Sequence, residues 1–283
     1  MKITFLGTGA APSCPLPFCM CEFCRVARER GGQNLRKRSS AIINDDLLID
    51  MGPDIMPAAS SYGKSIADVR YLLQTHSHSD HFDPQILTTR APEYMGVNTP
   101  MLQIHASTGT LEKMAEMVRS EGYVKNFLDA RDQLRMNLQV FPVKPLQSFK
   151  MGCYQVTAFP SDHDRSVESL LWAITQADFT LFYGTDTDLI PEDTWKGFKE
   201  KKLKFNIVVL DHTYGPGADG SGHLNAMRFL QQVQRMRAEA LLGVDARVLA
   251  THISHEGNLL HDELSQYAKK FGYEIAYDGL VVD

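Results

Sequence analysis

The sequence predicts an α/β protein, and two patterns support this fold class. Short apolar runs typical of buried strands alternate with amphipathic stretches of helical period along much of the chain. Three of the apolar runs, at 71–73, 154–159 and 248–251, are followed almost at once by histidines. This repeated arrangement predicts that the ends of the strands carry the functional site.

The densest group of metal-binding side chains follows the first of these runs. His76 and His78 are two positions apart, and on an extended backbone such side chains share a face, so both can reach one ion. Asp80 and His81 lie beyond a turn and point at a neighbouring position, so two adjacent ions fit better than one. Imidazole and carboxylate suit Zn²⁺, Mn²⁺ or Fe²⁺, and a pair of ions about 3.5–4 Å apart can hold a bridging hydroxide for hydrolysis. The alternative is a surface loop that happens to be rich in histidine.

Composition favours one globular domain. The 283 residues, 43% of them hydrophobic, can bury a large core, and no linker or repeat divides residues 1–283. A net charge of −5 argues against a nucleic-acid surface. The first residues lack the layout of a signal peptide, and no apolar run approaches the roughly 18 residues that span a bilayer. We therefore expect a soluble, cytoplasmic protein.

Three closely spaced cysteines, Cys19, Cys21 and Cys24, predict a structural zinc site. Three thiolates within six positions can surround one tetrahedral Zn²⁺ and leave room for a fourth ligand. Cys14 is near enough in sequence, but we prefer the remote His255. The alternative is three free thiols in a reducing cytosol.

The stretch from Thr75 to His81 resembles the T-H-x-H-x-D-H signature of the metallo-β-lactamase superfamily, without a gap. The resemblance implies a four-layered αβ/βα sandwich with a dinuclear metal centre at one edge of its two sheets. Together with the cysteine motif, it is closest to the cyclic phosphodiesterases of the carbon-phosphorus lyase pathway (the PhnP type).

This resemblance also implies a role for each candidate residue. It implies two Zn or Mn ions at the dinuclear centre and one structural Zn. It assigns His76, His78 and His163 to one ion, Asp80, His81 and His252 to the other, Asp186 to both, and Cys19, Cys21, Cys24 and His255 to the structural zinc. Catalysis falls to His223 and to Asp80, which is also a ligand.

Several of these positions have rivals close by in the sequence. Asp162 and Asp164 flank His163, Asp188 is the second candidate for the bridging carboxylate, and His212 competes with His223. The turn that begins at Gly7 lies near the metal centre in the superfamily, and Pro12 argues against a dinucleotide-binding loop there.

Further elements follow from local signals. A hairpin is expected at 40–50, a short helix at 54–62, a helix at 84–90 capped by Asp83, and a helix from Asn225 to about Leu242. The last helix, at 260–271 with His261, is expected to be ordinary surface, and the end of the chain to close the sheet.

A longer segment at about 91–138 exceeds what one strand-helix-strand return needs. We expect a strand at 100–105 and a helix at 110–121 within it, and a structural rather than ligating role for His105. We also expect the segment to border the pocket and to carry substrate selectivity.

These features predict a phosphodiesterase that opens a small cyclic phosphodiester. The expected substrate is 5-phosphoribosyl 1,2-cyclic phosphate or, failing that, a nucleoside 2′,3′-cyclic phosphate. No nucleic-acid or membrane partner is expected, and a homodimer is compatible with the resemblance. Two alternatives are a ribonuclease Z-like enzyme, for which the interval from His163 to Asp186 is too short to hold a basic arm, and a non-catalytic protein of pyrroloquinoline-quinone biosynthesis.

Overall fold

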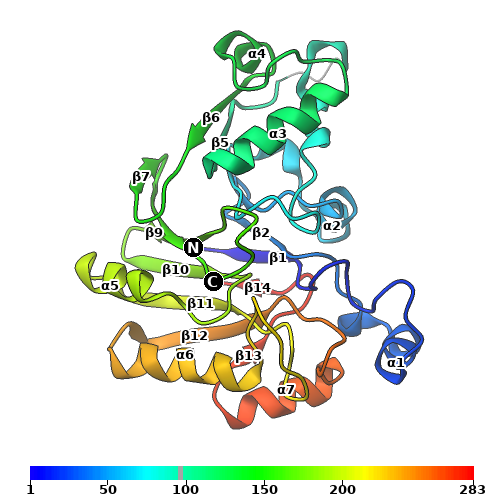
Figure 1. The fold of residues 1–283 in the computed structure, drawn as a ribbon, viewed down its shortest axis with the longest axis vertical. Coiled ribbons are helices and arrows are strands. Elements are labelled where there is room, and N and C mark those ends of the chain that lie inside the picture. The colour runs from blue at the N-terminus through cyan, green and yellow to red at the C-terminus, as the bar shows by residue number, and fades with distance from the viewer. Residues whose placement is uncertain (95–97) are drawn as a thin grey trace.

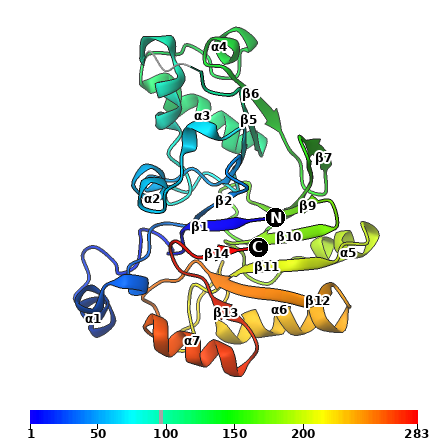
Figure 2. The same cartoon turned by 180° about the vertical axis from the view of Figure 1, so that it is seen from behind.

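Two mixed β-sheets form the centre of the computed structural model, which describes residues 1–94 and 98–283 (Figures 1 and 2). The first sheet has the order β14-β1-β2-β3-β4-β5-β6 and contains β1 (Ile3–Gly7), β2 (Ser40–Ile43), β3 (Leu47–Ile49), β4 (Tyr71–Leu73), β5 (Leu102–Ala106), β6 (Leu138–Pro142) and β14 (Val281–Val282). The second has the order β13-β12-β11-β10-β9-β8-β7 and contains β7 (Ser148–Met151), β8 (Tyr154–Pro160), β9 (Leu170–Gln176), β10 (Phe179–Gly184), β11 (Phe205–Asp211), β12 (Leu242–Thr251) and β13 (Glu274–Ile275).

Helices cover the outer faces of both sheets. The α-helices are α1 (Glu22–Arg30), α2 (Ile55–Ser61), α3 (Thr108–Ser120), α4 (Ala130–Arg135), α5 (Glu192–Glu200), α6 (Ala226–Ala238) and α7 (His261–Lys270). Short 3₁₀ helices are η1 (Gly32–Asn34), η2 (Ile66–Asp68), η3 (Pro84–Arg90) and η4 (Pro92–Tyr94). In Figure 1, α3 lies beside β5 and β6 in the upper part of the molecule, α6 and α7 lie below the strands of the second sheet, and α1 stands apart on an arm.

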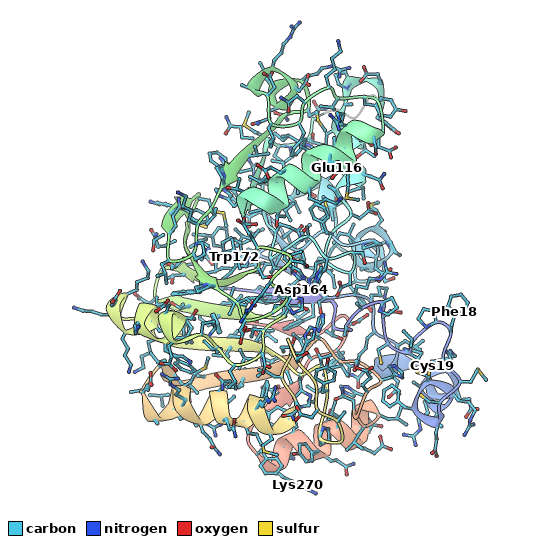
Figure 3. The ribbon with its side chains drawn as sticks, viewed as in Figure 1. Phe18, Cys19, Glu116, Asp164, Trp172 and Lys270 are labelled. Carbon is cyan, nitrogen blue, oxygen red and sulfur yellow. The ribbon has the colours of Figure 1, made fainter. Side chains whose placement is uncertain are left out.

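The strands alternate between two apolar layers, as the period of two requires. In β11, Ile207 and Val209 face the core between the sheets, whereas Val208 and Leu210 face α5, α6 and α7. A third apolar layer packs the first sheet against α2 and α3. Trp172 is buried between the sheets, and Phe18 is fully exposed on the α1 arm (Figure 3). The predicted four-layered αβ/βα sandwich is confirmed.

Several local predictions need correction. The helix expected at 84–90 is the 3₁₀ helix η3, and Asp83 makes no side-chain capping bond. Helix α6 ends at Ala238, because the chain enters β12 at Leu242. The end of the chain adds a strand to each sheet rather than to one. His261, expected at the surface, is buried and lies 3.0 Å from a buried Arg36 guanidinium nitrogen.

The segment at 91–138 forms η4, β5, α3, α4 and the start of β6, and its residues 95–97 lie outside the described part of the chain. His105 on β5 is buried and stacks between Phe141 and Phe149, with ring centroids 4.7 and 4.5 Å away. Its structural role is therefore consistent with the prediction. No helix among the described residues is long and apolar enough to cross a membrane.

Candidate metal centre

The predicted metal ligands gather where strands of both sheets end. His76 follows β4, His163 follows β8, Asp186 follows β10 and His252 follows β12. Their ligand atoms form two adjacent groups, one of His76, His78 and His163 and one of Asp80, His81, Asp186 and His252. The structure thus brings together all the residues expected at the dinuclear centre. Asp186, which the resemblance assigns to both ions, groups with Asp80, His81 and His252 but not with the first set.

Backbone geometry at these strand ends is unusual. Asp186 and His252 have φ angles of 55° and 59°, a left-handed conformation that is rare for non-glycine residues and often found at functional sites. Gly52 lets a neighbouring segment approach, since a Cβ on it would stand 2.4 Å from the carbonyl oxygen of Asp80. The backbone conformation at Asp186 and His252, and the close approach of the Asp80 segment to Gly52, help to place these ligands at the centre.

A buried carboxylate behind the centre fixes the orientation of His81. Asp50 is fully buried and accepts a hydrogen bond of 2.6 Å from Nδ1 of His81 and others from the backbone amide and hydroxyl of Thr75. Nδ1 of His81 therefore carries a proton, and its Nε2 is the atom directed at the centre. Asp50 received no functional role from the sequence, although its place directly after a strand was a usable signal.

The other buried histidines are fixed in the same way. Thr75 donates its hydroxyl proton to Asp50 and so accepts from Nδ1 of His76 at 2.9 Å. The Nδ1 atom of His163 donates to the carbonyl of Gly222 at 2.9 Å. Partners of this kind orient metal-binding histidines and set their tautomer.

His252 completes this set through a threonine. Thr213 donates to Asp211 at 2.8 Å and accepts from Nδ1 of His252 at 2.8 Å. As with the other three histidines, Nδ1 carries a proton and Nε2 is directed into the centre.

The inward-facing atoms are carboxylate oxygens and imidazole nitrogens, and this arrangement fits cations. Nε2 of His81 lies 2.9 Å from a carboxylate oxygen of Asp186 and 3.1 Å from one of Asp80, and these carboxylates outweigh burial and raise the pKa of His81 well above its usual value. Nε2 of His76 is buried without a hydrogen-bond partner. The carboxylates thus stabilise positive charge at this place, which is a proton on His81 in the absence of a metal and can be a divalent ion that displaces that proton.

Burial also keeps ligands in the form that binds metal. It holds the pKa of His76 well below the usual value and lowers the pKa of His163, so both imidazoles are neutral near pH 7. Neutral imidazole is the metal-binding form.

The cysteine cluster forms a second, separate candidate site. Cys19, Cys21, Cys24 and His255 have their ligand atoms within 4.8 Å of one another, and Nδ1 of His255 lies 3.6 Å from the sulfurs of Cys19 and Cys21. A tetrahedron with Zn–S of about 2.3 Å and Zn–N of about 2.0 Å has an S···N edge of about 3.6 Å. The donor set and its spacing therefore fit zinc.

Two details hold this cluster in place. Cys21 is the N-cap of α1, and its sulfur accepts the amide of Cys24. Arg28 on α1 donates to the carbonyls of Cys19 and Leu16 at 2.7 and 2.6 Å, a contact that the sequence did not reveal. Cys14 is buried and lies outside the cluster.

His223 lies beside the centre and forms an acid-base pair with Asp211. Its Nδ1 is 2.7 Å from the carboxylate of Asp211, which also accepts the amide of Thr213. Burial opposes a charge on His223, but the carboxylate of Asp211 outweighs it and raises the pKa to about 9. The imidazole is therefore protonated near neutral pH. Asp211 was not assigned a role from the sequence; its position at the end of β11 was the available signal.

The rival candidates have other partners. His212 is buried, and its Nε2 lies 3.1 Å from the hydroxyl of Tyr273. Burial lowers its pKa to about 4, as expected of a core histidine. Asp188 pairs with Arg228 at 2.9 Å, and Asp164 lies 3.4 Å from Nε2 of His78, on the ring edge that faces away from His163.

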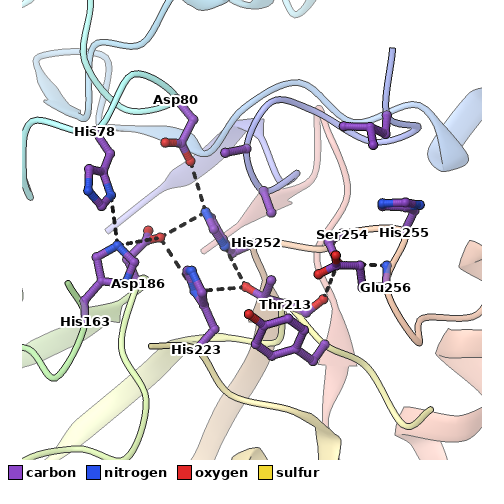
Figure 4. Close-up of a pocket in the computed structure, with 14 residues that line it drawn as sticks. His78, Asp80, His163, Asp186, Thr213, His223, His252, Ser254, His255 and Glu256 are labelled. Atoms are coloured by element: carbon purple, nitrogen blue, oxygen red, sulfur yellow. Dashed lines mark hydrogen bonds and ion pairs between the residues drawn. The ribbon is translucent and has the colours of Figure 1, made fainter. Parts of the chain in front are cut away.

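A cavity of about 240 Å³ opens over the centre (Figure 4). His78, Asp80, His163, Asp186, His223 and His252 form one end, and residues of the N-terminal turn and of the segment after β12 form the other. No described residue of 91–138 lines it, so the expectation that this segment borders the pocket is wrong for this cavity. The segment instead extends the far edge of the first sheet and covers its outer face.

Comparisons with known proteins agree with this geometry. A family model described as "Beta-lactamase superfamily domain" matches residues 46–253. No curated protein matches the chain. Solved structures with the same fold include a diphosphatase from the PhnP family (TM-score 0.74, 20% identity, 99% of this chain and 96% of that one). Others are Zn²⁺-bound PqqB from Methylobacterium extorquens (0.74, 18%, 100% and 100%) and human tRNase Z, short form (0.66, 17%, 100% and 99%).

The matched residues include all the ligands of the two inner groups and the strands that present them. The fold, the ligand spacing and the family match therefore lead to one assignment: this chain belongs to the beta-lactamase superfamily, whose members are mostly metal-dependent hydrolases.

Proposed function

We propose that this protein is a metal-dependent phosphodiesterase that opens a small cyclic phosphodiester to a monoester. The observation that carries the proposal is the pairing of His223 with Asp211 beside two groups of converging metal ligands. A protonated imidazole at this place suits a reaction whose leaving group is a basic alkoxide. The cavity of about 240 Å³ lies below the usual range for drug-sized ligands, which favours a small substrate.

The chain's own residues orient the attacking water and protonate the leaving group. Metal ions held by the two ligand groups would supply positive charge for the phosphoryl oxygens and would acidify water. Asp80 uses only Oδ2 in its contacts with His81 and His252, which leaves Oδ1 to orient the attacking water. Because these histidines hold the pKa of Asp80 far below its usual range against the effect of burial, the proton that the water loses passes to solvent rather than to Asp80. The new P–O bond forms to that water, and the P–O bond to the ring alkoxide breaks.

His223 completes the reaction by protonating the alkoxide. Its Nδ1 is engaged by Asp211, so Nε2 delivers the proton to the leaving oxygen. Overall, one water is consumed and one monoester with a free hydroxyl is formed. The proton that the water loses to solvent balances the proton that His223 gives to the alkoxide, and His223 regains a proton from solvent before the next turnover.

Substrate profiling of the purified, Mn²⁺- or Zn²⁺-loaded protein tests the proposal. We expect the highest kcat/KM with ribose or nucleoside cyclic phosphates, and much slower turnover of tRNA precursors, β-lactams and lactoylglutathione. The net charge of −5 supports this order, because polynucleotide binding depends on phosphate neutralisation. Preferred cleavage of tRNA precursor would point to a ribonuclease Z-like activity, and no turnover of any ester would point to a binding protein.

A further inference from the structure

The cavity has two chemically different ends. The end away from the metal ligands is formed by Ala10, Ala11 and Leu16, by the ring of Tyr214, and by Glu256. In Figure 4, Ser254, His255 and Glu256 lie on the side opposite His78 and His163. No lysine or arginine is among the described residues that line the cavity. An anionic group at this end would therefore meet a carboxylate and no compensating cation.

Glu256 has a fixed backbone position. Its amide donates to the hydroxyl of Ser254 at 2.9 Å, and that hydroxyl donates to the carbonyl of Thr213 at 2.7 Å. The preceding residue, His255, belongs to the cysteine cluster. Ser254 and His255, the two residues before Glu256, are thus both held in place. The cysteine cluster and this part of the cavity wall share one continuous segment of chain.

The carboxylate of Glu256 remains available. Glu256 is exposed to solvent where it lines the cavity, and its carboxylate forms no ion pair with any residue that the structure describes. Its charge contributes, after burial, to the raised pKa of the phenol of Tyr214, which also lines the cavity. A free carboxylate in such a place accepts hydrogen bonds from hydroxyl or amino groups and repels phosphate.

We propose that Glu256 is a specificity-determining residue that rejects substrates with a second phosphate. The cyclic phosphodiester would lie over the metal ligands, and the neutral, hydroxyl-bearing part would lie toward Glu256. This inference rests on the proposed phosphodiesterase activity. Of the two candidate substrate classes, it selects nucleoside 2′,3′-cyclic phosphates without a further phosphate over 5-phosphoribosyl 1,2-cyclic phosphate.

A matched substrate pair tests this selectivity. Uridine 2′,3′-cyclic phosphate and the same compound with an added 5′-phosphate differ only in the second anionic group. We expect kcat/KM to favour the first by about tenfold at low ionic strength, with the difference in KM, and the preference should shrink as salt is added. Glu256→Gln should remove most of the preference, and Glu256→Lys should reverse it.

Asp245→Asn provides the control for net charge. Asp245 is exposed on β12, six positions before its end at Thr251, or about 20 Å along the strand from the metal centre. It should leave the preference unchanged. An equal preference in the wild type and Glu256→Gln would overturn the role of Glu256, although the proposed activity would stand. Absence of turnover with both substrates, together with turnover of another ester class, would instead overturn the proposed activity.

Discussion

The two candidate metal sites contrast in how the chain builds them. The inner ligands come from the ends of strands in both sheets, are mostly buried, and have their orientation set by Asp50, Thr75, Thr213 and Gly222. The cysteine cluster lies on an arm outside the sheets, and Cys21 is exposed. Its order depends on a helix cap and on Arg28.

This difference indicates that the inner site serves the reaction and that the cysteine cluster serves the stability of the fold. A buried centre with preset tautomers holds its ligands before any ion arrives, so binding costs little reorganisation. An exposed cluster at a helix N-terminus gains much of its order from the metal itself. We therefore expect substitutions at the inner site to affect the reaction, and substitutions at the cluster to affect mainly metal content and stability.

The largest expected effect is at the acid-base pair beside the inner site. His223→Ala should lower kcat on an alkyl phosphodiester by about 10²–10⁴ with metal content unchanged, because the alkoxide loses its proton donor. Steady-state or stopped-flow kinetics with a nitrophenyl phosphodiester provides the control. Nitrophenolate needs little protonation as it leaves, so its kcat should fall much less. Equal losses on both substrates would show that His223 holds the metals or the bound substrate instead.

The second effect is at the carboxylate behind His81. Asp50→Asn should lower metal affinity or activity by about 10–100-fold, because an amide no longer fixes the His81 tautomer. Metal titration followed by calorimetry measures it. Unchanged affinity would show that the centre does not depend on its preset orientation, and the contrast between the two sites would fail.

At the cysteine cluster, Cys21→Ser should remove one metal per chain and lower the Tm, while kcat/KM changes only a few-fold. Serine preserves the N-cap of α1, so the variant isolates loss of the metal from loss of the cap. Elemental analysis and thermal unfolding test this. Cys153→Ser is the matched control, because Cys153 is exposed and outside the cluster. If Cys21→Ser retained every metal, the zinc assignment would be wrong.

The smallest effect concerns a buried histidine outside both sites. Burial lowers the pKa of His105 to about 4, below its usual 6.5, so the unfolded chain binds this proton first as pH falls. Its stabilising contribution is therefore present above about pH 6.5 and is lost progressively as the pH falls toward 4.

His105→Phe keeps an aromatic ring between Phe141 and Phe149 without a titratable group. Between pH 7 and 5 it should reduce the loss of unfolding free energy by about 1–2 kcal/mol relative to the wild type, as measured by urea denaturation. Parallel pH profiles for the two proteins would contradict the assignment.

The sequence by itself determined the features that depend on local spacing. The stretch from His76 to His81 contains four metal-binding side chains within six positions. Apolar runs identify the strands that precede His163 and His252. Such patterns depend on chain geometry over a few residues, so they survive without knowledge of the tertiary contacts. The superfamily fold followed from this signature.

Only the tertiary structure decided which distant groups meet. Asp50 and Asp211 take their partners from other elements, and neither received a role from the sequence. His255 was named through the resemblance, but its approach to the cysteines across 236 positions exists only in the fold. The cavity wall was misjudged, because the segment at 91–138 extends the far edge of the first sheet, whereas Glu256, which follows β12, forms part of the wall away from the metal ligands. No local period encodes these pairings; they arise when the two sheets pack and bring the ends of their strands together.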